Sequence, residues 1–394
     1  MGKPFRILVL NQISANGLKR LPVETYTAAK DIHDPDAILL RSADLHGIEI
    51  PASVKAIARA GAGTNNVPVQ AMSARGVPVF NAPGGNANAV KELVLAGMLM
   101  AARNLAPALR FVDRLEPGAA DLDQMVESGK KDFAGFELAG QTLGIVGLGK
   151  IGCLVADAAI KLGMDVLGYD PEITVDAAWR LPAQVRRAGS VADVLRKANF
   201  VSLHVPLVEA TRDLVGEANM GLTRRGAVLL NFSREGVVND AAVLAALDSG
   251  QLGWYVCDFP GRAILRHPRV VALPHLGAST REAEENCAVM VVDQLRDYLE
   301  QGNICNAVNF PHVSMSRESR FRVAIANANV PNMLGQISTA MASAGLNIHN
   351  MVNKSRGDMA YTLVDVDSPV ADSVIAALVG IQGVLAVRYL PQAE

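Results

Sequence analysis

The sequence predicts an α/β protein with two doubly wound parallel sheets and a smaller α+β domain at its C-terminus. Short apolar runs alternate with helical or turn segments over residues 1–310, the order expected of successive βα units. A glycine-rich turn follows one of these runs, and a separate set of strands and helices follows a polar stretch after residue 310. With 394 residues, of which 50% are hydrophobic, the chain can bury more than one core.

The two larger sheets are predicted from apolar runs in chain order. The expected strands lie at 7–10, 37–40, 56–60, 77–80, 143–146, 166–169, 200–205, 227–232, 255–259 and 270–273. Residues 89–103 are expected to form a helix because Val90, Val94 and Met98 fall on one stripe. Residues 282–300 are expected to form a long amphipathic helix for the same reason.

The C-terminal domain is predicted from short elements that follow a polar linker. The expected strands are 322–326, 348–353, 361–366 and 386–390, and the expected helices are 331–344 and 370–379. We therefore predict five segments, which are a first domain in two pieces (1–99 and 285–310), a nucleotide-binding domain (100–284), a linker (311–319) and a terminal domain (320–394).

Charge and cysteine content exclude several classes of partner. A formal charge of −2, with lysines and arginines scattered, gives no general attraction to nucleic acid or to an anionic membrane. The four cysteines form no C-x-x-C pair, so we expect free thiols and predict no metal site. The longest apolar stretch, 93–102, is too short to span a bilayer. We expect a soluble cytoplasmic protein whose partners are small molecules or further copies of the chain.

Three glycines carry the first functional prediction. Gly147, Gly149 and Gly152 have the spacing G-x-G-x-x-G between an apolar strand and an alanine-rich helix expected at 154–162. Such a turn lets the backbone approach a pyrophosphate and places this anion at the helix N-terminus. The sequence therefore predicts a site for a dinucleotide.

An acidic residue distinguishes between the two common dinucleotides. Asp170 ends the strand at 166–169, near the position at which a dinucleotide-binding βαβ unit carries its ribose-binding acid. A carboxylate there accepts hydrogen bonds from the ribose 2′-hydroxyl but repels a 2′-phosphate, and Pro171 and Glu172 offer no arginine. The sequence therefore predicts NAD rather than NADP.

Two later strands end in residues that can reach one ligand. Arg234 follows the strand at 227–232 and His275 follows the strand at 270–273. The carboxyl ends of strands face the ligand crevice of an open parallel sheet. These stretches, together with the glycine turn, closely resemble the D-2-hydroxyacid dehydrogenase family.

Further segments narrow the resemblance. Arg41-Ser42, 61–67, 80–83 and 307–310 are similar to the branch of that family that oxidises 3-phosphoglycerate. Residues 320–394 resemble an ACT domain, a small regulatory module that binds small molecules. The resemblance implies two Rossmann- or flavodoxin-like domains, NAD as cofactor and a homo-oligomer.

The resemblance implies roles for individual residues. His275 would be the base that takes the hydroxyl proton, and Arg234 would hold the substrate carboxylate with its planar fork. Asp258 would lie beside the nicotinamide carboxamide, with a turn-initiating aspartate as the alternative. The residues implied to bind NAD are Gly147, Gly149, Lys150, Ile151, Gly152, Asp170, His204, Val205, Pro206, Ser233, Asp258 and Gly277.

The substrate residues implied by the resemblance precede the nucleotide-binding domain. The amides of Ala62 and Gly63 would bind the carboxylate, since glycine allows a close backbone approach. Arg41, Ser42 and Asn86 would bind the phosphate end. The alternative for Arg41 is a solvated charge at a strand end.

The family's catalytic glutamate is absent. By spacing, Ala263 occupies its position, and no carboxylate stands between Asp258 and His275. Three explanations are open. Either Glu282 or Glu284 supplies the carboxylate, or His275 acts without a carboxylate partner, or the chain has lost catalysis and only binds nucleotide and ligand. We favour the second, because a neutral imidazole can still accept a proton during alcohol oxidation.

The terminal domain keeps part of an effector pattern. Asn327 stands where serine-regulated enzymes carry a histidine, and Asn329 and Asn347 keep the two asparagines of the pattern. Amide side chains can bind L-serine or another amino acid. The alternative is that Asn329 caps a helix and Asn347 lies in its exit turn.

The resemblance therefore implies NAD-dependent oxidation of 3-phospho-D-glycerate to 3-phosphohydroxypyruvate, the first step of L-serine biosynthesis. Two alternatives remain open, a hydroxypyruvate or glyoxylate reductase and a non-catalytic NAD(H)-sensing protein.

Overall fold

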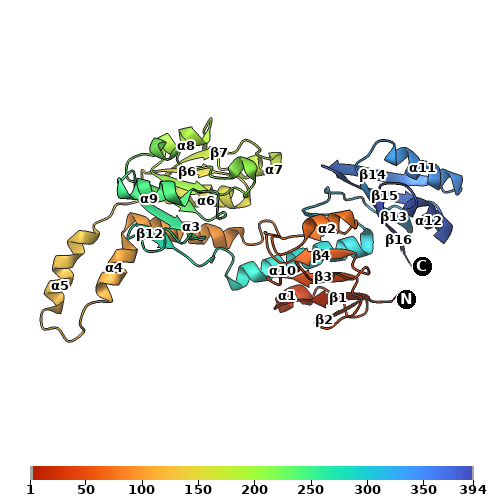
Figure 1. The fold of residues 1–394 in the computed structure, drawn as a ribbon, viewed down its shortest axis with the longest axis horizontal. Helices are drawn as coiled ribbons and strands as arrows, with labels where there is room; N and C mark the ends of the chain where they lie inside the picture. The colour runs from red at the N-terminus through yellow and green to blue at the C-terminus, as the bar shows by residue number, and fades with distance from the viewer. Residues whose placement is uncertain (1–2, 393–394) are drawn as a thin grey trace. The chain divides into compact units, whose positions relative to one another are not determined.

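A computed structural model describes residues 3–392, which form two compact units (Figure 1). Unit 1 is made of 1–86 and 281–394, and unit 2 of 87–280. The chain therefore changes units at 86/87 and 280/281, whereas we predicted 99/100 and 284/285. The difference arises because the buried face of helix α3 (Ala87–Ala102) packs along its length in the core of unit 2, and that of helix α10 (Arg281–Gln301) in the core of unit 1.

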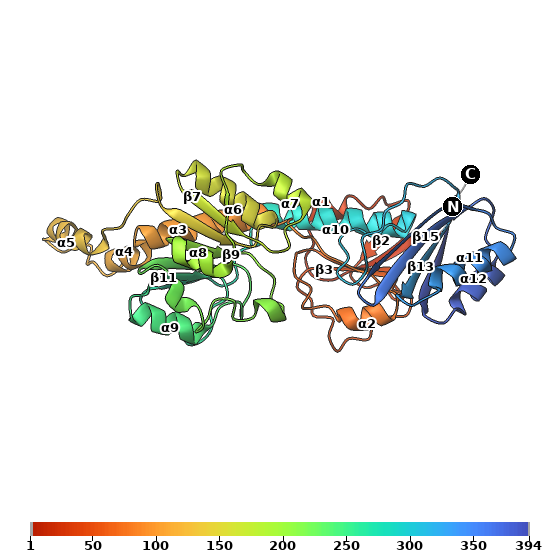
Figure 2. The ribbon, with the colours of Figure 1, turned by 90° about the horizontal axis from the view of Figure 1, so that it is seen from above.

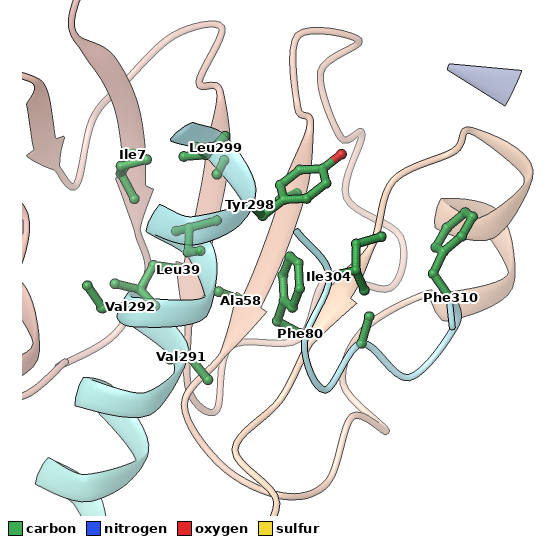
Figure 3. Close-up of a cluster of buried hydrophobic side chains, with 14 of the residues drawn as sticks. Ile7, Leu39, Ala58, Phe80, Val291, Val292, Tyr298, Leu299, Ile304 and Phe310 are labelled. Atoms are coloured by element: carbon green, nitrogen blue, oxygen red, sulfur yellow. The ribbon is translucent and has the colours of Figure 1, made fainter. Parts of the chain in front are cut away.

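Unit 1 begins with a five-stranded parallel sheet in the order β2-β1-β3-β4-β5. The strands are β1 (Phe5–Val9), β2 (Tyr26–Ala29), β3 (Ala37–Leu40), β4 (Ala56–Arg59) and β5 (Val79–Phe80). Helices α1 (Ala15–Leu18) and α10 lie on one face, and α2 (Val69–Ala74) lies on the other. In Figure 3 the side chains of Val291, Val292 and Leu299 on α10 meet Ile7 and Leu39 of the sheet.

Unit 2 contains a seven-stranded parallel sheet in the order β12-β11-β10-β9-β6-β7-β8. The strands are β6 (Thr142–Val146), β7 (Asp165–Tyr169), β8 (Arg186–Arg187), β9 (Phe200–Leu203), β10 (Ala227–Asn231), β11 (Leu252–Cys257) and β12 (Val270–Ala272). Helices α3 and α6 (Lys150–Lys161) cover one face, while α8 (Val191–Lys197) and α9 (Asp240–Asp248) cover the other. The predicted doubly wound α/β fold is confirmed.

The remaining helices of unit 2 are short or peripheral. They are α4 (Leu105–Val112), α5 (Leu122–Gly129), α7 (Val175–Arg180) and the 3-10 turns η1 (Lys130–Phe133), η2 (Glu209–Thr211) and η3 (Met220–Leu222). Helices α4 and α5 bury no residue and project from unit 2 as a pair, which we call the arm (Figure 1).

Unit 1 ends in a four-stranded antiparallel sheet in the order β14-β15-β13-β16. We call residues 320–392 the terminal module. Its strands are β13 (Phe321–Ala328), β14 (Ile348–Arg356), β15 (Met359–Val366) and β16 (Val384–Pro391). Helices α11 (Met333–Ser343) and α12 (Asp372–Val379) lie together on one face of this sheet (Figure 2).

The other face of the terminal sheet packs on the first part of unit 1. Tyr361 and Leu363 of β15 belong to the same core as Tyr298 of α10 and Phe310. The Tyr361 hydroxyl donates to the Gly302 carbonyl oxygen at 2.7 Å. The module therefore shares a hydrophobic core with the five-stranded domain.

The segment predicted as a linker takes part in this packing. Val313 and Met315 are 0% and 5% exposed, and Val313 forms a β-bridge with Ile304. Residues 311–319 are thus an ordered connection whose apolar side chains alternate with polar ones.

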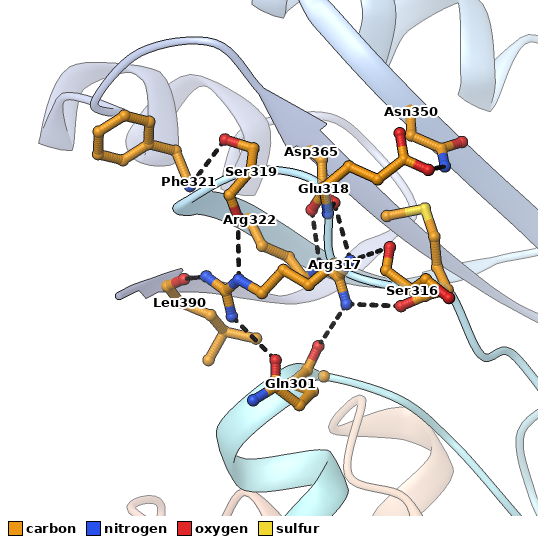
Figure 4. A network of polar contacts seen from close by, with 12 residues as sticks. Gln301, Ser316, Arg317, Glu318, Ser319, Phe321, Arg322, Asn350, Asp365 and Leu390 are labelled. Carbon is orange, nitrogen blue, oxygen red and sulfur yellow. Dashed lines mark hydrogen bonds and ion pairs between the residues drawn. The ribbon is translucent and has the colours of Figure 1, made fainter. Parts of the chain in front are cut away.

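A buried ion pair joins the module to this connection (Figure 4). Arg322 and Asp365 have fully buried side chains, with Nε 2.6 Å and Nη2 2.8 Å from the two carboxylate oxygens. The other guanidinium N–H groups donate to three backbone carbonyls, those of Gln301, Met315 and Ser316. All five N–H groups of Arg322 are therefore used, as burial of a charge requires.

Within residues 3–392, no single helix is long and apolar enough to cross a membrane. Helices α3 and α4, which are bent relative to each other, are together long and apolar enough by length and composition only. Half of the residues of α3 are buried in the core of unit 2.

Candidate active site

Two glycines of the turn in unit 2, Gly147 and Gly152, leave no room for a side chain. A Cβ at Gly147, whose φ is 93°, would lie 2.4 Å from the His204 carbonyl oxygen, and one at Gly152 would lie 2.0 Å from the Gly147 oxygen. A Cβ at Gly149 would meet nothing within 4 Å. Open space therefore lies above the turn, where the backbone can approach a bound group.

Helix α6 begins earlier than we predicted. It starts at Lys150 rather than Leu154, so that Lys150 and Ile151 lie in its first turn, directly after Gly149. The glycine turn and the helix N-terminus are consequently one structure, as a pyrophosphate site requires.

Asp170 follows β7 and lies beside this turn. Its Oδ2 accepts a hydrogen bond from the Leu148 amide at 2.8 Å, and its Oδ1 accepts one from the Glu172 amide at 2.9 Å. A carboxylate has about four acceptor positions, so the two amides fix its orientation and leave others for ribose hydroxyls.

His204, after β9, also faces the glycine turn. Its Nε2 lies 2.9 Å from the Ser202 hydroxyl, whereas its buried Nδ1 has no partner among the described residues. Burial lowers the pKa of His204 to about 4, so the ring is neutral. Val205 lies close to Gly147, and Pro206 is exposed beyond it. The open turn, the oriented Asp170 and the unpaired Nδ1 fit a bound dinucleotide.

The residues after β10 form a tight polar turn. Asn231 Oδ1 accepts from the Ser233 amide at 3.1 Å and from its hydroxyl at 2.8 Å, while Asn231 Nδ2 donates to the Arg234 carbonyl at 3.0 Å. Arg234 Nη1 donates to the Ser233 carbonyl at 2.6 Å. Sequence reasoning missed Asn231, although an asparagine at the end of an apolar strand was a usable signal.

Asp258 has a structural task in this chain. Its two carboxylate oxygens accept hydrogen bonds from the Leu276 amide at 2.7 Å and the Gly277 amide at 2.8 Å. A Cβ at Gly277 would lie 3.0 Å from that carboxylate. Burial raises the pKa of Asp258 despite these amide bonds. The carboxyl group thus holds the turn that carries His275, and any nicotinamide contact would use its remaining lone pairs.

His275 occupies a backbone conformation that is rare for residues other than glycine, with φ at 55°. Its amide donates to the Asp258 carbonyl at 3.1 Å, and its ring centroid lies 4.5 Å from that of Phe259. Ala263 is exposed, and the neighbouring Ile264 anchors this segment in the core.

The carboxylates proposed to replace the missing glutamate are paired elsewhere. Glu284 Oε1 lies 2.7 Å from Arg41 Nη1, and Glu282 Oε1 lies 3.1 Å from Arg281 Nη2. Both stand in the first turn of α10. Both belong to unit 1, whereas His275 belongs to unit 2.

The predicted substrate residues of unit 1 lie at the ends of β3 and β4. The Arg41 carbonyl accepts from Arg59 Nε at 3.0 Å, and the Ser42 amide donates to Asn11 Oδ1 at 3.1 Å. The guanidinium of Arg59 lies over Gly61, where a Cβ would be 1.8 Å from Nη1. Arg59 is a second cation beside Arg41 that sequence reasoning missed.

The neighbouring loops supply polar groups. The Ala62 carbonyl accepts from Asn81 Nδ2 at 2.6 Å, so its loop, which continues into Gly63, is held in place. Asn86 Oδ1 is buried without a partner among the described residues. Strand-end contacts thus bring Arg41, Arg59 and the 61–63 loop together.

The three asparagines predicted to bind an effector do not lie close together within a single copy of the chain. Asn327 and Asn329 stand where β13 ends, with Ala328 opposite Met359, whereas Asn347 precedes Ile348, which pairs with Val366 at the other end of β15. Seven residues of β13 separate these ends, or about 23 Å. Asn327 is 1% exposed, and Asn329 Nδ2 donates to the Gly357 carbonyl at 3.0 Å. A single small effector cannot touch both ends.

Comparison with known proteins agrees with the fold and the nucleotide turn. Residues 95–277 match the family model "D-isomer specific 2-hydroxyacid dehydrogenase, NAD binding domain". The solved D-mandelate dehydrogenase of Rhodotorula graminis shares the fold, with a TM-score of 0.67 at 22% identity over 80% of this chain and 100% of its own. An NAD+-bound 3-phosphoglycerate dehydrogenase of Entamoeba histolytica does so with a TM-score of 0.61 at 23% identity, over 77% of this chain and 98% of its own.

Curated relatives extend the similarity over most of the chain. The D-3-phosphoglycerate dehydrogenase of Haemophilus influenzae is 33% identical over 341 residues, which are 83% of this chain and 79% of the relative. That of Methanocaldococcus jannaschii is 31% identical over 325 residues, 80% of this chain, but the match spans only 59% of the relative's length. The chain therefore belongs to the D-isomer-specific 2-hydroxyacid dehydrogenases, a family of NAD-dependent enzymes.

Proposed function

We propose that this enzyme oxidises 3-phospho-D-glycerate to 3-phosphohydroxypyruvate with NAD, the first step of L-serine biosynthesis. The observation that carries the substrate assignment is the pair of guanidinium groups at adjacent strand ends. Arg59 contacts the Arg41 backbone and lies over Gly61, so its guanidinium borders the loop predicted to bind the carboxylate. The Arg41 guanidinium follows the adjacent strand and pairs with Glu284 at 2.7 Å. Guanidinium forks match phosphate oxygens in charge and geometry. The names of the curated relatives support the same substrate.

The residues of unit 2 would supply the chemistry. The glycine turn, Asp170 and His204 would hold NAD, which accepts a hydride when bound. Arg234 would hold the substrate carboxylate, and His275 would take the hydroxyl proton as the C–H electron pair leaves as hydride. The alcohol carbon is thereby oxidised to a ketone, with one hydride and one proton removed.

The test is cofactor reduction with a panel of 2-hydroxy acids. Turnover should be fastest with 3-phosphoglycerate, and Arg59→Gln should raise its KM far more than that of an unphosphorylated acid. Equal effects on both acids would favour a hydroxypyruvate or glyoxylate reductase. Absence of turnover with every acid, despite tight NADH binding, would favour a non-catalytic NAD(H)-sensing protein, the alternative that the missing glutamate supports.

We also propose a homo-oligomer in which the arm contributes an interface. Leu109 and Val112 of α4 are 61% and 56% exposed although they are large and apolar. An amino-acid effector such as L-serine would then bind between two copies of the terminal module, with Asn329 from one and Asn347 from the other. The four free cysteines support a cytoplasmic location.

A further inference from the structure

The Phe259 side chain in unit 2 lies beside both His275 and Arg234, the proposed base and the proposed carboxylate-binding residue. The ring centroids of Phe259 and His275 lie 4.5 Å apart with their planes at 50°, an arrangement typical of aromatic pairs. The guanidinium carbon of Arg234 lies 5.9 Å from the Phe259 centroid, within the range of a cation–π interaction.

The His275 ring lacks the partner that usually orients a catalytic imidazole. Within residues 87–280, all of which the structure describes, no carboxylate forms an ion pair with this ring. The backbone of His275 is fixed through Asp258, but rotation about its side-chain bonds is not. His275 is exposed, and the Phe259 ring is the aromatic neighbour that packs beside its imidazole.

The backbone explains why Phe259 stands there. Asp258, immediately after β11, binds the amides of Leu276 and Gly277 and accepts from the His275 amide. These three bonds hold the turn against the end of β11, so the next residue, Phe259, lies opposite His275. Any side chain at 259 would occupy this place, but an aromatic ring provides a flat, stiff surface with a negative face.

We propose that Phe259 is the positioning residue for His275 and Arg234 and replaces the orienting function of the glutamate lost at position 263. The inference rests on the proposed oxidation. The ring limits the imidazole to orientations from which it can accept the hydroxyl proton, and its π face stabilises the imidazolium that forms. The same ring holds the Arg234 guanidinium at the edge of the site.

Phe259→Leu, which keeps an apolar side chain but removes the ring, tests the proposal. We expect kcat for 3-phosphoglycerate oxidation to fall about 10- to 100-fold, because small misplacements of a catalytic group are costly. The Kd for NADH should stay within about twofold, and Phe259→Tyr should keep kcat within about threefold. Phe136→Leu is the matched control, because Phe136 contacts Phe200 elsewhere in unit 2, and it should leave kcat unchanged.

Two results would overturn the proposal. One is a Phe259→Leu enzyme with kcat within about twofold of wild type, and the other is a Phe259→Tyr enzyme as slow as Phe259→Leu. If Phe259→Leu loses NADH binding through misfolding, Phe259→Met decides by the same criterion.

A measurement without turnover separates this inference from the proposed function. In the protein labelled with 15N-histidine, the His275 ring protons, assigned with His275→Gln, should lose a ring-current shift in Phe259→Leu. An unchanged shift refutes the contact. Absence of wild-type turnover with any 2-hydroxy acid refutes the proposed function instead, whatever the shift does.

Discussion

We expect Arg322→Met to destabilise unit 1 by about 3–5 kcal/mol, the usual cost of removing one member of a buried ion pair. Both side chains of the pair are 0% exposed, and the guanidinium satisfies Asp365 and three backbone carbonyls. Methionine fills much of the same volume but leaves the carboxylate buried without its cation. The loss arises from this unpaired charge rather than from a cavity.

The positions of the tryptophans allow the unfolding of unit 1 to be distinguished from that of unit 2. Both tryptophans, Trp179 and Trp254, lie in unit 2, so their fluorescence follows unit 2 during urea unfolding while far-UV circular dichroism follows both units. With a slope of about 3 kcal/mol per molar urea, the unit 1 transition should move by roughly 1–2 M. The fluorescence midpoint should move much less.

Two variants separate the charge effect from general damage. The double variant Arg322→Met/Asp365→Leu should recover most of the lost stability, because replacing both charges by apolar groups removes the unpaired carboxylate. Arg20→Met removes an exposed ion pair with Asp293 in the same unit and should leave the transition where it is. A loss below about 1 kcal/mol in Arg322→Met, or a double variant as unstable as the single one, would refute the reasoning.

Three further predictions concern pH, catalysis and assembly. Burial raises the pKa of Asp365, but its hydrogen bonds lower it by more, so the folded-state pKa lies below the ordinary value. The contribution of Asp365 to stability is therefore complete above pH ~4 and is lost as pH falls through the folded pKa, so the acid limb of stability should be weaker in Asp365→Asn. Ala263→Glu should move the acid limb of the kcat–pH profile upward by about one unit and speed keto-acid reduction, because a carboxylate near His275 favours imidazolium; an unchanged profile would argue that position 263 does not face the histidine. Leu109→Glu/Val112→Glu should reduce the oligomer mass in light scattering without changing the circular dichroism, and an unaltered mass would exclude the arm as an interface.

Elements with strong local patterns were predictable from the sequence. The runs at 37–40 and 200–205 contain fully buried strands, β3 and β9, because strands covered on both faces have no polar alternation. Two edge strands, β2 and β8, were missed for the converse reason. β2 has two exposed residues in four, and β8 consists of Arg186 and Arg187. Neither forms an apolar run, since one side of an edge strand meets solvent.

The polar network of the site was less accessible. Gly147, Gly152 and Asp170 belong to a local motif, and the structure gives each one a steric or hydrogen-bonding reason. The contacts of Arg59 with Arg41 and of Phe259 with His275 join residues far apart in sequence or on different strands. Spacing does not encode such pairs, because they depend on strand order and on the turn that Asp258 holds.

The shared core of unit 1 bears on how the proposed regulation could be tested. A terminal module is a natural candidate for deletion, in the expectation of an enzyme that no longer responds to the proposed effector. Here a cut at residue 319 would uncover Tyr298 and Phe310, which are 2% and 1% exposed in the whole chain. It would also remove both Arg322 and Asp365, and with Arg322 the donor to three carbonyls of the remaining chain. We expect such a fragment to aggregate, so an unregulated variant is better sought by point changes in the module's outer edge than by truncation.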